Sequence, residues 1–152
     1  MLKKSSLAFL IVAILLLNGI IYLRAIYTLK GFEFIFGECA RNSGRTSAAL
    51  NLIILILLGY YGLKKIYTSE LLKSDFLKLI SLFAINHLIH FFFVYSYFTN
   101  HITDLSISHN PHGFITFVCI ILLPFIIWKS KKVTPLLYIG VILHLVNVTY
   151  FI

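Results

Sequence analysis

The stretch FLKLISLFAINHLIHFFFVYSYF, residues 76–98, determines the class of protein to which this chain belongs. At about 1.5 Å of rise per residue, a helix of this length crosses the hydrocarbon layer of a bilayer, which is about 30 Å thick. Two histidines, His87 and His90, lie near its middle and, being three residues apart, project from one helix face. An ionisable side chain at that depth faces protein, water or a ligand. These histidines are therefore the first candidates for a functional site.

The composition indicates a polytopic membrane protein. Hydrophobic residues make up 60% of the 152 residues and charged residues only 12%, and the mean hydropathy is +0.96. A soluble domain of this size could not bury so much apolar surface. The formal charge of +8 comes from Lys and Arg that flank the apolar runs, where such residues meet lipid headgroups. The lipid bilayer is thus the expected partner, and nucleic acid is not.

Five apolar runs predict an all-α bundle of five transmembrane helices that forms a single domain. The first run follows Lys3 and Lys4 and is read as a retained helix, because it is longer than a signal-peptide core and lacks a clean cleavage site. Residues 24–45 are expected to form a long loop with an interfacial turn at residues 31–37. Pro124 predicts a kink in the fourth helix. The predicted helices are residues 7–23, 46–63, 76–98, 114–128 and 133–152.

The distribution of Lys and Arg predicts the orientation. With the N-terminus in the cytoplasm, nine of these residues lie on the cytoplasmic side and four on the outer side, as the positive-inside rule favours. The C-terminus is then outside. We expect a multi-pass protein of the bacterial cytoplasmic (inner) membrane. The four residues on the outer side are Arg24, Lys30, Arg41 and Arg45.

A third histidine, His144, lies in the last apolar run. Counted from the cytoplasmic ends of their helices, His87 and His144 are both about 11 residues deep, which is roughly 16 Å. Two imidazoles at one level on neighbouring helices are what bis-histidine ligation of a b-type haem needs, in an apolar pocket. Arg41 and Arg45 could pair with the haem propionates.

Two other interpretations remain open. Histidines inside a membrane bundle also serve as hydrogen-bonding ties between helices, which would make this a non-catalytic accessory or assembly protein without a cofactor. A third interpretation places a metal ion at His101, His109 and His112, although no acidic or cysteine partner has the spacing of a closed site. The sequence contains no flavin, nucleotide or catalytic motif, so an enzyme acting alone is not expected.

Three segments, in order, resemble the ferric-reductase-like transmembrane group of bacterial haem b proteins. ARNSGRTSAALNLIILIL (40–57) resembles the entry to one helix of that group, LKLISLFAINHLIHFFFVYSYF (77–98) its histidine helix, and HGFITFVCIILLPFIIWKS (112–130) the next helix. The resemblance covers about residues 40–150. It implies a bundle that holds haem b and passes electrons across the membrane, with a redox partner protein or quinone as the electron source.

The family resemblance and the depth of the histidines favour different ligands within residues 76–98. By motif register, His90 matches the group's ligand, and His87 matches a second histidine found in only some members. On the last helix the group carries a histidine near the start, where this chain has Thr134 or Pro135. Either His144 replaces that ligand or haem binding was lost. The expected cofactor-binding residues are His87, His90, His144 and Arg45, with the three histidines as candidate ligands of the haem iron.

Overall fold

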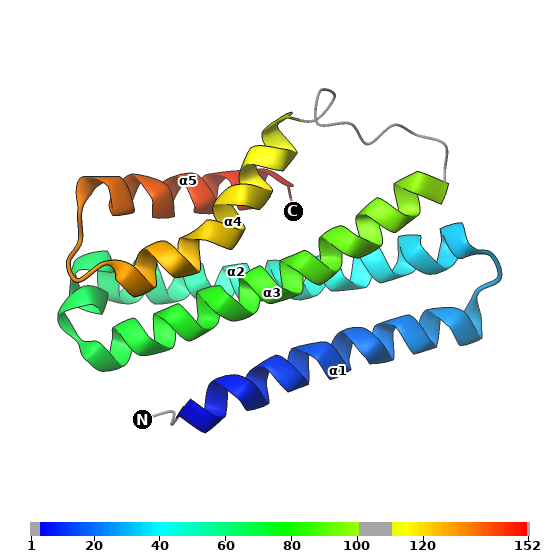
Figure 1. Cartoon of the computed structure of the whole chain (residues 1–152), viewed down its shortest axis with the longest axis horizontal. Coiled ribbons are helices and arrows are strands. Elements are labelled where there is room, and N and C mark those ends of the chain that lie inside the picture. The colour runs from blue at the N-terminus through cyan, green and yellow to red at the C-terminus, as the bar shows by residue number, and fades with distance from the viewer. Residues whose placement is uncertain (1–3, 101–110, 152) are drawn as a thin grey trace.

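The computed structural model describes residues 4–100 and 111–151, and within them all regular structure is α-helical. The prediction of an all-α fold with five helices is confirmed for this part of the chain (Figure 1). The helices are α1 (Lys4–Thr28), α2 (Phe32–Thr68), α3 (Glu70–Asn100), α4 (Pro111–Lys129) and α5 (Pro135–Phe151).

Three of these helices, α1 to α3, are long and apolar enough to cross a membrane. They contain 25, 37 and 31 residues, whereas about 20 apolar residues suffice for one crossing. The helices α4 and α5 are shorter, at 19 and 17 residues. In α1, only 6% of the most apolar window is buried, so nearly the whole helix is available to lipid. These are the features of an integral membrane protein.

The long first loop expected at residues 24–45 is not present. Helix α1 continues to Thr28 and α2 begins at Phe32, so only residues 29–31 connect them. The drop in hydropathy suggested a loop, but backbone hydrogen bonding in a helix does not require apolar side chains. Polar pairs one helical turn apart, such as Glu38 with Arg41, support helix there instead.

Helix α2 changes direction near its end at Gly62. This residue has φ 69° and ψ 150°, well outside the helical region, and separates two helical pieces. Only glycine adopts such a conformation without strain. The short piece after it carries Leu63 and Ile66 into the apolar core. The predicted run 46–63 is therefore the interior of a longer, broken helix.

The helices pack in an order that leaves α1 at one side of the bundle. Helix α1 packs against α2 and α3, while α4 and α5 lie on the other side of the α2–α3 pair (Figure 1). Helix α4 bends along its length, and Pro124 lies inside it (Figure 1), as expected for a residue that cannot donate a backbone hydrogen bond.

Two apolar clusters flank a polar layer in the α1–α3 part of the bundle. The larger cluster joins α2, α3, α4 and α5 and includes Ile54, Phe83 and Leu137. The smaller cluster, around Cys39 and Phe93, joins α1, α2 and α3. Between them along α2 and α3 lie buried asparagine and serine side chains and the histidines of α3.

Candidate functional site

The three predicted histidines lie together around Phe83. The rings of His87 and His90 have centroids 5.3 Å apart. Phe83 stacks on His87 at 5.5 Å and meets His144 of α5 edge-on at 5.3 Å. Both His87 and His144 thus contact the same aromatic ring, and their common depth in the membrane stays a prediction. We call these four residues the histidine cluster.

The helical period explains why α3 presents these side chains together. Phe83, His87 and His90 are spaced by four and three residues, which places them on one face. On α5, Val141 is buried one turn before His144 and belongs to the larger apolar cluster. Burial of that face turns His144 inward, and its side chain is only 1% exposed.

Close approach of α2 to α3 places His90 against Gly44. A Cβ atom at Gly44 would lie 3.2 Å from His90 Cε1, closer than ordinary van der Waals contact. The absence of a side chain at residue 44 thus allows the imidazole to lie against the α2 backbone. The sequence analysis did not single out Gly44, although a glycine among small residues before an apolar run is typical of close helix packing.

Ser43 determines which nitrogen of His90 carries the proton. Ser43 Oγ lies 3.1 Å from His90 Nδ1 and 2.7 Å from the carbonyl oxygen of Cys39, to which it donates. A hydroxyl has one proton, so the shorter bond to Cys39 favours His90 Nδ1–H as the donor to Ser43. The neutral ring then keeps its lone pair on Nε2, the form in which a histidine binds a metal.

The other two histidines have buried ring nitrogens without partners. Among the residues that the structure describes, both nitrogens of His144 and Nδ1 of His87 are buried and have no hydrogen-bond partner. A buried polar atom left unpaired costs about 1–3 kcal/mol, and in a native protein such atoms call for an explanation such as a ligand. His144 is the clearest case, because its whole ring is enclosed.

The donor atoms of the cluster suit axial ligation of haem iron, which takes neutral imidazole nitrogens in an apolar setting. His144 on α5 and His87 or His90 on α3 supply those nitrogens from two helices. Phe83 contacts the rings of both His87 and His144. A cofactor held by both imidazoles would therefore also contact the Phe83 side chain.

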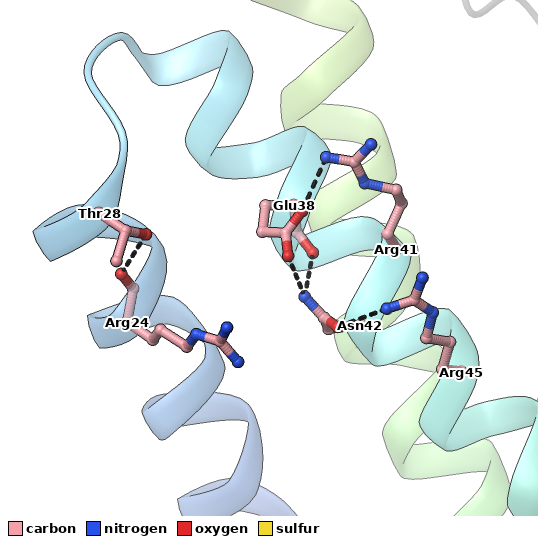
Figure 2. A network of polar contacts seen from close by, with 6 residues as sticks. All are labelled: Arg24, Thr28, Glu38, Arg41, Asn42 and Arg45. Atoms are coloured by element: carbon pink, nitrogen blue, oxygen red, sulfur yellow. Dashed lines mark hydrogen bonds and ion pairs between the residues drawn. The ribbon is translucent and has the colours of Figure 1, made fainter.

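Arg45, the fourth predicted site residue, lies apart from the cluster contacts. Its guanidinium is exposed and donates from Nη1 to Asn42 Oδ1 at 3.2 Å. Arg41 and Asn42 both donate to Glu38, each at 2.7 Å (Figure 2). Because Arg45 follows Gly44 by one residue, it points about 100° around α2 from the face that meets His90.

A polar network missed by the sequence analysis lies beside the histidine cluster. Asn86, the residue before His87, accepts from Asn18 Nδ2 of α1 at 2.9 Å and donates to Ser47 Oγ of α2 at 2.8 Å. It also donates to the carbonyl oxygen of Ser43 at 3.0 Å. This last bond connects the network to the serine that contacts His90.

The outer-loop histidines cannot be compared with their prediction. His101 and His109 lie outside the described residues, and His112 belongs to α4 without a described side chain. Among the residues that the structure does describe, no group of three or more His, Cys, Asp or Glu side chains is arranged to hold a metal ion. A haem iron needs only two histidines, so the absence of a group of three does not bear on haem binding.

Comparisons with known proteins add no relative. No protein-family model matches the chain, and neither the curated proteins nor the solved structures contain a match. The interpretation of the site therefore depends on its own chemistry.

Proposed function

We propose that this chain is a multi-pass membrane protein that holds haem b within the histidine cluster and relays electrons across the bilayer. His144 of α5 and His87 or His90 of α3 would hold the haem iron through their ring nitrogens. The observation that carries the proposal is the enclosed His144 ring, whose two nitrogens lack partners. In this proposal all five helices cross the membrane, and a redox partner protein or quinone delivers the electrons.

The residues of the chain would act by holding and shielding the cofactor. Haem b supplies reversible one-electron chemistry when it is bound. The imidazoles would bind it, and Ser43 keeps His90 Nε2 available by accepting a hydrogen bond from Nδ1–H. The larger apolar cluster, which includes Phe83, excludes water from this region. Arg45 remains a candidate for pairing with a propionate if its side chain turns from Asn42.

The alternative function is that of an accessory or assembly protein without a cofactor. Two observations favour it: Phe83 packs against the rings of both His87 and His144, and Ser43 ties His90 to α2. In this alternative the histidines only hold helices together, as polar side chains do in lipid.

Absorption spectroscopy of the purified protein tests the proposal. The chain is expressed with haem supplied, purified in detergent, and recorded oxidised and after reduction with dithionite. We expect sharp reduced b-type bands at close to one haem per chain. His144→Ala removes an axial ligand, so it should abolish haem retention. Wild-type protein that remains colourless would favour the accessory function instead.

Three further variants distinguish the ligands from the packing. His87→Ala and His90→Ala identify the ligand on α3, because only the true ligand's loss should shift or abolish the reduced bands. His109→Gln, in the polar segment before the fourth apolar run, is the matched control and should keep the spectrum. A His144→Ala protein with an unchanged haem spectrum would exclude His144 as a ligand.

A further inference from the structure

A partly open cavity lies between α1 and α2, away from the residues of the histidine cluster. Its volume is about 410 Å³. Both polar and apolar side chains line this cavity. A void left by imperfect packing of a core would be lined by apolar side chains alone. The polar side chains that line the α1–α2 cavity are Arg24, Thr28, Glu38, Asn42 and Thr46.

Arg24 is the lining residue whose positive charge is not paired with a carboxylate in the described part of the chain. Figure 2 shows its guanidinium extending from α1 towards α2. Among the residues that the structure describes, no hydrogen bond or ion pair involves this guanidinium, whereas its backbone carbonyl accepts a bond from Thr28. A guanidinium is permanently charged and presents several donors suited to phosphate and carboxylate oxygens. An unpaired arginine at a cavity therefore favours an anionic occupant.

Glu38 does not neutralise Arg24, because its carboxylate is already engaged. One oxygen accepts from Arg41 and the other from Asn42, each at 2.7 Å (Figure 2). The Glu38–Arg41 ion pair is thus balanced within α2. With Arg24 and Arg45 added, the local charge is positive, which attracts an anion to this end of the α1–α2 hairpin.

The surroundings of the cavity indicate that the anion belongs to a lipid. Ile21, one turn before Arg24, and Ala25, the residue after it, line the cavity, and the large side chains of Ile20 and Leu23 on α1 are exposed. An acyl chain could lie along this apolar surface. Arg24 itself lies five residues before the connection at 29–31, near the depth at which basic residues reach headgroups.

We propose that the α1–α2 cavity binds the phosphate of an anionic phospholipid, with Arg24 as its main donor. Asn42 and Thr46 line the opposite wall on α2. The acyl chains lie along the exposed apolar surface of α1. The site depends on membrane insertion but not on haem, so lipid retention and the haem spectrum report on separate proposals.

The test is lipid binding to the purified full-length chain, measured by native mass spectrometry with phosphatidylglycerol and phosphatidylcholine as probes. We expect the wild type to retain phosphatidylglycerol preferentially. Loss of a charge-assisted contact in Arg24→Gln should weaken that binding by about tenfold. Lys30→Gln removes the same charge from the exposed tip of the hairpin, outside the cavity lining, and should bind as the wild type does.

A second variant and a competitor complete the test. Thr46→Leu fills the cavity without changing charge and should also weaken lipid binding. Inorganic phosphate at millimolar concentration should not displace the lipid, because it cannot use the apolar wall. Equal lipid binding by wild type, Arg24→Gln and Thr46→Leu would overturn the site. Displacement by inorganic phosphate alone would overturn the lipid as its occupant.

Discussion

Asn86 connects three helices through a single buried amide. It bonds to Asn18 of α1 and to Ser47 and the Ser43 carbonyl of α2, and its side chain is fully buried. Hydrogen bonds between transmembrane helices each contribute about 0.6–2 kcal/mol. Asn86 is therefore more than a space-filling residue, since its removal leaves polar groups unpaired on two neighbouring helices.

We predict that Asn86→Ala lowers the free energy of unfolding in detergent by about 1–3 kcal/mol, because Asn18, Ser47 and the Ser43 carbonyl each lose a buried hydrogen bond. Asn51→Ala is the matched control. Asn51 is also buried, but its Oδ1 has no partner, so its loss should cost less, below about 1 kcal/mol. Chemical unfolding followed by circular dichroism compares the two. Equal losses would show that the network adds nothing beyond packing.

At the residue scale, the sequence pointed to part of the site. The depth argument paired His87 with His144, and both lie against Phe83. The contact of Ser43 with His90 could not be predicted, because it depends on the register between α2 and α3.

At the scale of elements, Gly62 separates the two pieces of α2. Residues with a Cβ atom rarely adopt a φ of 69°, the value at Gly62. Gly59, three residues earlier, has no atom within 4 Å of a Cβ placed there and no positive φ. A Cβ atom at Gly62 would also have no atom within 4 Å, so the same substitution at the two positions isolates the conformational requirement at residue 62.

We predict that Gly62→Ala lowers the free energy of unfolding by about 1–3 kcal/mol, because alanine is strained at this φ and ψ. Gly59→Ala should leave stability unchanged or raise it by about 0.5–1 kcal/mol, because alanine favours helix over glycine. Thermal unfolding of the two purified variants makes the comparison. Equal stability of the two variants would mean that alanine at residue 62 is not strained.

The connection between α1 and α2 shows where hydropathy misleads. Charged residues between positions 24 and 45 lower the mean hydropathy, which suggested a loop. The chain remains helical to Thr28 and again from Phe32, because polar side chains such as Glu38 and Asn42 bond to each other on the helix surface. Hydropathy reports where a helix can meet lipid, not where it begins and ends.

At the scale of the whole molecule, the arrangement follows from which faces meet protein and which meet lipid. Helix α1 exposes large apolar side chains such as Phe9 and Leu16 along its length, while α3 contributes much of the buried core. The charges remain at the ends of the apolar runs, where they orient the protein in the membrane.

We predict that the N-terminus lies in the cytoplasm and the C-terminus outside. A C-terminal alkaline phosphatase fusion should be active in bacteria, because that enzyme requires export, and a green fluorescent protein fusion at the same position should be dark. Fusions after Lys132, between α4 and α5, should behave in the opposite way. An inactive phosphatase at the C-terminus would mean that the chain crosses the membrane an even number of times or that its N-terminus lies outside.

The sequence by itself determined the membrane class, the number of helices and the residues able to reach the middle of the bundle. These depend on composition and on a period of 3.6 residues, which are local properties. Only the tertiary structure decided that Phe83 contacts both His87 and His144, that Ser43 bonds to His90, and that Arg24 faces a cavity. Those relations depend on the register and rotation of one helix against another, which side chains far apart in the chain settle together through close packing.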